Sequence, residues 1–159
     1  MQTPISTLVQ SYIKNSTAYK AYGTTTRHLH LEGLEGYPLA QFLRMIARKH
    51  KGRIWVICPT EESAKDLLKD SGVSQNQDAP YSNELKTIYL PSNGRKLYTP
   101  FSGDNVEYEQ INRLTSITEM RHGMIVTHLR AFVGPLVSPE TLSASSLSVR
   151  VGGAFDSIS

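Results

Sequence analysis

Apolar residues recur along the chain with two different periods, which predict helices and strands in turn. Helical spacing predicts an amphipathic helix from about Pro4 to Lys20, extended by a further turn to Tyr22, and another helix that begins at Pro38 and ends at Gly52. Strict alternation in the segment 27–31 predicts a strand between these two helices. The first helix is expected to turn one apolar face inward, formed by Ile5, Leu8, Val9, Tyr12 and Ile13.

Downstream of Gly52, short apolar runs alternate with helical patterns. Residues 53–58 are almost entirely apolar after the first, which is typical of a strand that is covered on both faces. Further strands are predicted at 87–90 and 124–127, helices at about 60–72, 106–121 and from Ser138, and a half-exposed strand at 146–151. This order predicts an α/β fold with a parallel sheet, doubly wound or related to that topology.

Length and composition limit the class of protein. A chain of 159 residues has the usual size of one compact domain. Its composition, with 39% hydrophobic and 19% charged residues, excludes a charge-dominated disordered chain. The single cysteine excludes an intramolecular disulfide, and no apolar run is long enough to cross a membrane. Because the first ten residues do not resemble a secretory signal, a cytoplasmic setting is expected.

Positive charge is concentrated in the first third of the chain. Residues 1–57 contain eight Lys or Arg and two acids, whereas the remainder contains nine Lys or Arg and twelve acids. A cluster of this kind is a candidate surface for nucleic acid, because cations displace the counterions of phosphates. The simpler interpretation is a solvated helix end whose cations complement the helix dipole, since no aromatics are interleaved. The cluster consists of Arg44, Arg48, Lys49, Lys51 and Arg53.

The junction before the second long helix has the order strand, glycine loop, helix, which is the order that cradles phosphate groups. Aligned with the phosphate-binding P-loop from Gly33, the loop keeps the first glycine and a middle one, Gly36. However, Pro38 replaces the second signature glycine, Leu39 replaces the lysine, and Ala40 replaces the serine or threonine. The two glycines are then typical of a plain tight turn, and we expect no bound nucleotide or other cofactor.

Other candidate residues carry weaker signals. His28, His30 and Glu32 would share one face of a strand and could hold Zn²⁺, but a strand with a polar face is the simpler explanation, so no metal site is expected. Cys58 ends an apolar strand and is expected to be a buried, inert thiol. The long loop 91–105, with Tyr98 and Phe101, either packs on the sheet or contacts a partner.

Four segments together resemble a known family. They are HLEGLEGYPLAQFLRMIARKH, RIWVICP, YLPSNGRKLYTPFSGDNVEYEQINRLTSI and GMIVTHLRAFVGPLVSPETLSASSLSVRVG. In their order and spacing they resemble the N-terminal module of the bacterial transcription-repair coupling factor (Mfd) family, which is itself similar to the excinuclease subunit UvrB. The resemblance extends from about Thr25 to the end of the chain.

The resemblance implies a RecA/P-loop-like three-layer fold with helices on both faces of a parallel sheet. UvrB has an intact P-loop ending in Gly-Lys-Thr, whereas the coupling factor has a degenerate one, as residues 33–40 do here. UvrB also has a long tyrosine-rich hairpin where this chain has the shorter loop 91–105. The implied division is an N-terminal helical segment, 1–23, a RecA-like subdomain, 24–137, and the start of a UvrA-binding subdomain, 138–159.

The function implied by the resemblance is that of a non-catalytic scaffold. Coupling factors recognise RNA polymerase stalled at a lesion, displace it with a separate ATP-driven translocase and recruit UvrA. UvrA, RNA polymerase and DNA would therefore be partners through a longer parent protein, and the chain itself is expected to be monomeric. The alternative function, taken from the residues alone, is a nucleotide- or phosphate-binding domain that uses Gly33 and Gly36 in a non-standard way.

Overall fold

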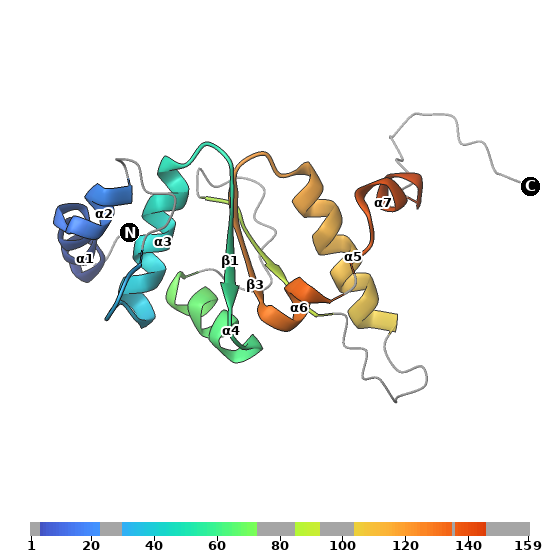
Figure 1. The fold of residues 1–159 in the computed structure, drawn as a ribbon, viewed down its shortest axis with the longest axis horizontal. Coiled ribbons are helices and arrows are strands. Elements are labelled where there is room, and N and C mark those ends of the chain that lie inside the picture. Colours follow the sequence, from blue (N-terminus) through green and yellow to red (C-terminus); the bar gives the residue numbers. More distant parts are fainter. Residues whose placement is uncertain (1–3, 23–29, 73–84, 93–103, 135, 146–159) are drawn as a thin grey trace, which may run out of the picture.

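In the described residues, a parallel sheet of three strands has helices on both faces (Figure 1). The computed structural model describes residues 4–22, 30–72, 85–92, 104–134 and 136–145. Its elements, in chain order, are α1 (Pro4–Asn15), α2 (Thr17–Tyr22), α3 (Gly36–Lys49), β1 (Arg53–Cys58), α4 (Glu61–Asp70), β2 (Thr87–Leu90), α5 (Asp104–Glu119), β3 (Gly123–His128), α6 (Leu129–Val133) and α7 (Pro139–Ser145). The predicted α/β class and parallel sheet are confirmed.

Strand β3 lies in the centre of the sheet, between β1 and β2. Arg53 pairs with Gly123 at the start of the β1–β3 ladder, and Cys58 pairs with His128 at its end. Strand β2 pairs with β3 from Thr87 onward. Because all strands run in one direction, their first residues form one edge of the sheet, called here the amino edge, and their last residues form the carboxyl edge.

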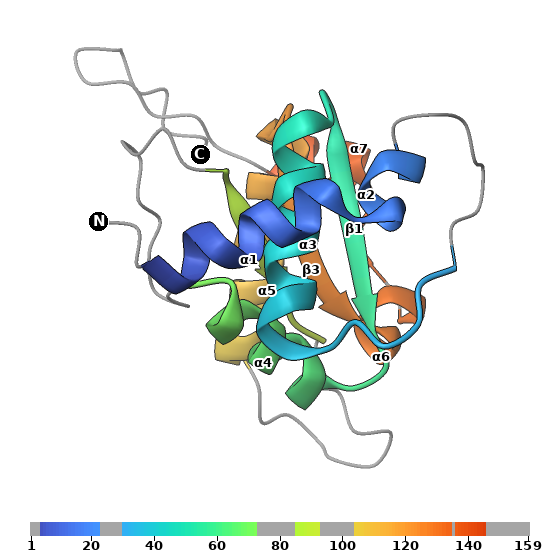
Figure 2. The ribbon, with the colours of Figure 1, turned by 90° about the vertical axis from the view of Figure 1, so that its left-hand side faces the viewer.

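Two apolar clusters cover the two faces of the sheet. On one face, Met124 and Val126 of β3 pack against Ala47 of α3 and Leu68 of α4. On the other face, side chains of β2 and β3 pack against α5 in a cluster that also includes Leu142 of α7. Helices α1 and α2 lie outside α3, and α7 lies outside α5, so the layers follow one another across the molecule (Figures 1 and 2).

Local sequence signals explain where several elements begin and end. Thr60 caps α4 in a reciprocal arrangement with Ser63, whose backbone N–H donates to Thr60 Oγ1 at 3.1 Å. After α4, Gly72 adopts a φ of 72°, which ends the helix as predicted. Ser138 Oγ accepts a hydrogen bond of 3.2 Å from the backbone N–H of Thr141 and so starts α7. The predicted strands 53–58 and 87–90 have the same limits in the structure.

The N-terminal helix differs from the prediction in two respects. It is interrupted at Ser16, whose hydroxyl accepts a hydrogen bond of 3.2 Å from the N–H of Tyr19 and so caps a separate helix, α2. Its apolar residues also do not share one buried face. Ile13 is buried against α3, whereas Leu8 and Tyr12 are 72% and 79% exposed.

Two predicted strands lie partly or wholly outside the described residues. His30 and Leu31, the last residues of the predicted strand 27–31, are not in a strand, while its other residues and the predicted strand 146–151 lie outside the described residues. The prediction that β1 is covered on both faces is wrong. Strand β1 is at the edge of the described sheet, and Trp55 and Ile57 remain 41% and 42% exposed. Among the described helices, none has both the length and the apolar character that crossing a membrane requires.

Candidate functional site

The predicted phosphate loop, residues 33–40, leads into α3, which begins at Gly36 and whose N-terminus lies toward the carboxyl edge of the sheet (Figure 1). Gly33 and Gly36 have φ angles of 70° and 56°. This left-handed region is readily open only to glycine, so the turn itself requires both residues. The geometry therefore agrees with a tight turn, and the glycines need no ligand to explain them.

The side chains that replace the P-loop lysine and hydroxyl residue face the core. Ala40 is 1% exposed and belongs to the same buried cluster as Ala64 and Leu68. Leu39 is half-buried and packs against this cluster. In a working P-loop these two positions reach the phosphates and Mg²⁺. Here they hold α3 against α4, and Pro38, which lacks an N–H, removes a further donor from the first turn.

Carboxylates surround the start of α3. Glu35 is the exposed N-cap residue, and its side chain makes no capping hydrogen bond. An Asp70 oxygen lies 3.6 Å from the position that a Cβ on Gly36 would take. These negative charges stabilise the helix by interacting with the positive end of its dipole, but they repel a phosphate group. The loop thus occupies the place, before a helix N-terminus, where proteins often bind anions, but the charge around it is negative.

The structure divides the predicted basic cluster. Arg44 Nη1 donates a hydrogen bond to the carbonyl of Ser71, the C-cap residue of α4. Arg53 Nη1 donates to the carbonyl of Ile117, in the last turn of α5, at 3.1 Å. Both guanidinium groups thus complement the negative end of a helix. The other members, Arg48, Lys49 and Lys51, are exposed at the end of α3 and in the turn after it.

The candidate zinc ligands do not form a metal centre in the described part of the chain. His30 Nε2 lies 3.1 Å from Glu32 Oε1, and both side chains are 86% exposed. His28 lies outside the described residues, as do Tyr98 and Phe101 of the long loop. Across residues 4–22, 30–72, 85–92, 104–134 and 136–145, no group of three or more His, Cys, Asp or Glu is placed to hold a metal ion.

Three polar side chains lie on the α4 side of the sheet, toward its carboxyl edge. Cys58 is buried as predicted, and burial raises the pKa of its thiol. It neighbours His128, of which Nε2 is buried without a hydrogen-bond partner among the described residues. The hydroxyl of Tyr89 is likewise buried and unpartnered, and burial raises its pKa to about 12. The register of the sheet brings these residues together, and no motif in the sequence predicts that they would be neighbours.

An exposed apolar surface, which the sequence did not predict, extends from β1 over α6. The rings of Trp55 and Phe132 meet edge to face, with 5.9 Å between centroids. Val133, in the last turn of α6, is 70% exposed. The apolar surface consists of Trp55, Ile57, Leu129, Phe132, Val133, Leu136 and Val137, each more than one third exposed. The alternation of Trp55 and Ile57 could have suggested it only if the edge position of β1 were known.

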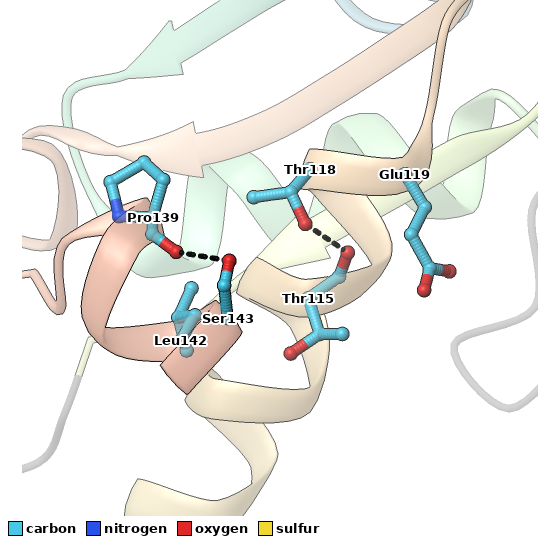
Figure 3. Close-up of a pocket in the computed structure, with 6 residues that line it drawn as sticks. All are labelled: Thr115, Thr118, Glu119, Pro139, Leu142 and Ser143. Carbon is cyan, nitrogen blue, oxygen red and sulfur yellow. Dashed lines mark hydrogen bonds between the residues drawn. The ribbon is translucent and has the colours of Figure 1, made fainter. Parts of the chain in front are cut away.

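A shallow pocket of about 260 Å³ lies between α5 and α7 (Figure 3). Its hydroxyl groups are used within their own helices, since Thr118 Oγ1 donates to the carbonyl of Thr115 at 2.7 Å and Ser143 Oγ to that of Pro139 at 3.0 Å. These groups are therefore not free to donate to a ligand. The pocket is lined by Thr115, Thr118, Glu119, Pro139, Leu142 and Ser143.

Comparisons of the chain with protein-family models, with curated proteins and with solved structures found no match.

Proposed function

We propose that the chain is a RecA-like subdomain that serves as a non-catalytic interaction module of a transcription-repair coupling factor. In this proposal the longer parent protein displaces stalled RNA polymerase with an ATP-driven translocase and recruits UvrA. Support comes from the ordered sequence segments that resemble this family and from the parallel α/β arrangement of the same segments. The proposal places the protein contact of this chain on the apolar surface.

The apolar surface is the observation that carries the interaction role. Seven large apolar side chains of β1, α6 and the residues that follow α6 are each more than one third exposed, and the rings of Trp55 and Phe132 are in contact. Large exposed apolar patches are uncommon on proteins that act alone and mark contact sites for other proteins. Trp55 and Phe132 are of the residue types that dominate the binding energy of protein interfaces. Val137 leads directly into α7, where the second subdomain is expected to begin.

The loop before α3 supports the non-catalytic part of the proposal. Leu39 and Ala40 are directed to the core, and Glu35 and Asp70 bring negative charge to the start of the helix. A nucleotide bound there would find neither the lysine nor the hydroxyl that P-loop enzymes use. In this proposal the chain has the architecture of an ATPase, but apolar residues that pack in the core occupy the positions of the catalytic groups.

A binding measurement with purified UvrA and with RNA polymerase tests the interaction role. We expect one of them to bind the immobilised chain, and Trp55→Ala to weaken that binding about thirty-fold or more, as truncation of an aromatic hot spot does. Tyr12→Ala, which removes an exposed aromatic from α1, is the matched control and should leave the affinity unchanged. If neither protein binds, or if both variants bind like the wild type, the proposed interaction surface is wrong.

A thermal-shift titration with ATP and Mg²⁺ separates this function from the alternative, a nucleotide-binding domain. We expect no rise in the melting temperature at millimolar ATP, because a ligand stabilises only a native state that binds it. A nucleotide at one hundred times its Kd would add about 2.7 kcal/mol, which for a domain of this size raises Tm by roughly 5–10 °C. Tripolyphosphate with Mg²⁺ is the control for general polyanion binding, and a rise specific to ATP would establish the alternative.

A further inference from the structure

The amino edge of the sheet gathers basic residues from three separate parts of the sequence. One group comes from the end of α3 and the turn that leads into β1, another precedes β2, and the third precedes β3. Only the first of these groups is evident as a cluster in the sequence. Together they comprise Arg48, Lys49, His50, Lys51, Arg53, Lys86, Arg121 and His122.

Backbone hydrogen bonds hold the three groups side by side. The N–H of Gly123 donates to the carbonyl of Gly52 at 3.3 Å, and the N–H of Met124 donates to the carbonyl of Lys86 at 2.9 Å. His122 reaches α3 as well, because its Nε2 lies 3.0 Å from the carbonyl oxygen of Ala47. The basic segments are therefore fixed by the sheet and by α3, so their charges occupy one preformed edge.

Some of these side chains are already engaged. Arg53 is bonded to α5, and Lys49 Nζ lies 5.6 Å from the centre of the Tyr19 ring. The exposed cations whose side chains make no hydrogen bond or ion pair with another described residue are Arg48, Lys51, Lys86 and Arg121. The acids nearest in sequence to this group are Glu119, at the end of α5, and Glu84, which lies outside the described residues. Four cations are thus available to an anionic partner.

We propose that the amino edge binds the sugar–phosphate backbone of duplex DNA without reading its sequence. Clustered Lys and Arg on a rigid edge bind polyanions by releasing their counterions. A duplex is favoured over a single strand because single strands are bound largely by stacking on aromatic rings. Two aromatics of the described residues already contact side chains of this edge: Tyr19 lies under Lys49, and the Tyr22 hydroxyl lies 3.4 Å from His50 Nδ1.

This inference does not rest on the proposed repair role, because the charges would attract DNA in any cellular setting. It also relocates the predicted nucleic-acid surface. Arg44 is excluded, since its guanidinium bonds the end of α4, and Lys86 and Arg121 take part instead. The surface lies at the opposite end of the sheet from the glycine loop before α3, so phosphate recognition has no connection with the P-loop position.

A salt series of affinity for a random-sequence DNA duplex tests the proposal. With four phosphate contacts, the affinity should fall about 100-fold between roughly 50 and 200 mM salt. The double variant Lys51→Glu/Arg121→Glu should weaken binding about ten-fold or more at the lower salt and should reduce the log–log salt slope by about two. Both residues are exposed, so the variant should retain the melting temperature of the wild type.

The matched control is Lys14→Glu/Lys69→Glu, which changes the net charge equally on α1 and α4, outside the amino edge. We expect this control to change the affinity less than about three-fold, since charges beyond a Debye length are largely screened. Equal weakening by the two double variants would show a general charge effect and overturn the proposal. Absence of duplex binding at low salt, or binding that is insensitive to salt, would also overturn it.

Discussion

Replacement of Gly123 by alanine is expected to destabilise the fold by roughly 3 kcal/mol or more, through backbone strain and overpacking. Gly123 begins β3 with a φ of 147°, a conformation that other residues rarely adopt. An added Cβ would lie 2.3 Å from the carbonyl oxygen of Lys86 and 2.8 Å from Sδ of Met120. The Lys86 carbonyl accepts the hydrogen bond from Met124 that joins β2 to β3, so it cannot move without loss of pairing. Urea denaturation measures the effect.

Gly33→Ala is the matched control for this change. Gly33 also has a positive φ, 70°, but nothing lies within 4 Å of the position that its Cβ would take. Only the conformational penalty of about 1–2 kcal/mol is then expected. If Gly123→Ala reduced the free energy of unfolding no more than Gly33→Ala does, the segment before β2 could not approach the start of β3 as closely as the structure shows.

Leu68→Ala is the second change expected to have a large effect, with a loss of about 2–5 kcal/mol in the free energy of unfolding. Leu68 is 2% exposed and packs in the cluster that joins α3 and α4 to the sheet. Truncation removes buried methyl groups and leaves a cavity that the surrounding side chains can only partly fill. Urea unfolding with an unchanged m-value would show that stability alone has changed.

Leu129→Ala makes the same chemical change on the apolar surface. Leu129 is 53% exposed, so we expect a loss of less than about 0.5 kcal/mol. The contrast between the two leucines tests whether the apolar surface contributes to the stability of the isolated chain. A loss at Leu129 that approaches the loss at Leu68 would show that this surface belongs to the core, and would remove the main support for the interaction role.

The sequence predicted the elements well wherever a local physical signal marked them. The apolar run 53–58 matches β1, and Thr60 and Gly72 mark the ends of α4 through capping and a left-handed turn. The Pro38–Leu39–Ala40 triplet lacks the P-loop lysine and hydroxyl, and the structure shows Leu39 and Ala40 packed in or against the core cluster. Such signals depend on neighbours in the chain and therefore need no tertiary information.

What the sequence could not predict depends on contacts between distant segments. An apolar strand looks the same at the centre and at the edge of a sheet, so the exposure of Trp55 and Ile57 followed only from the strand order. The charge cluster was predicted from adjacency in the chain, whereas the amino edge joins Lys51, Lys86 and Arg121 through strand pairing. The same pairing places Cys58 beside His128.

The parallel direction of the three strands also gives the described charges a polarity along the sheet. The cations of the amino edge are at one end, and the carboxylates of Glu35 and Asp70 are toward the other. A particle with separated charges rotates in the field of a polyanion before it makes contact. The chain should therefore approach DNA with a preferred orientation, amino edge first. The apolar surface, on a face of the sheet, would then stay open to a protein partner during that encounter.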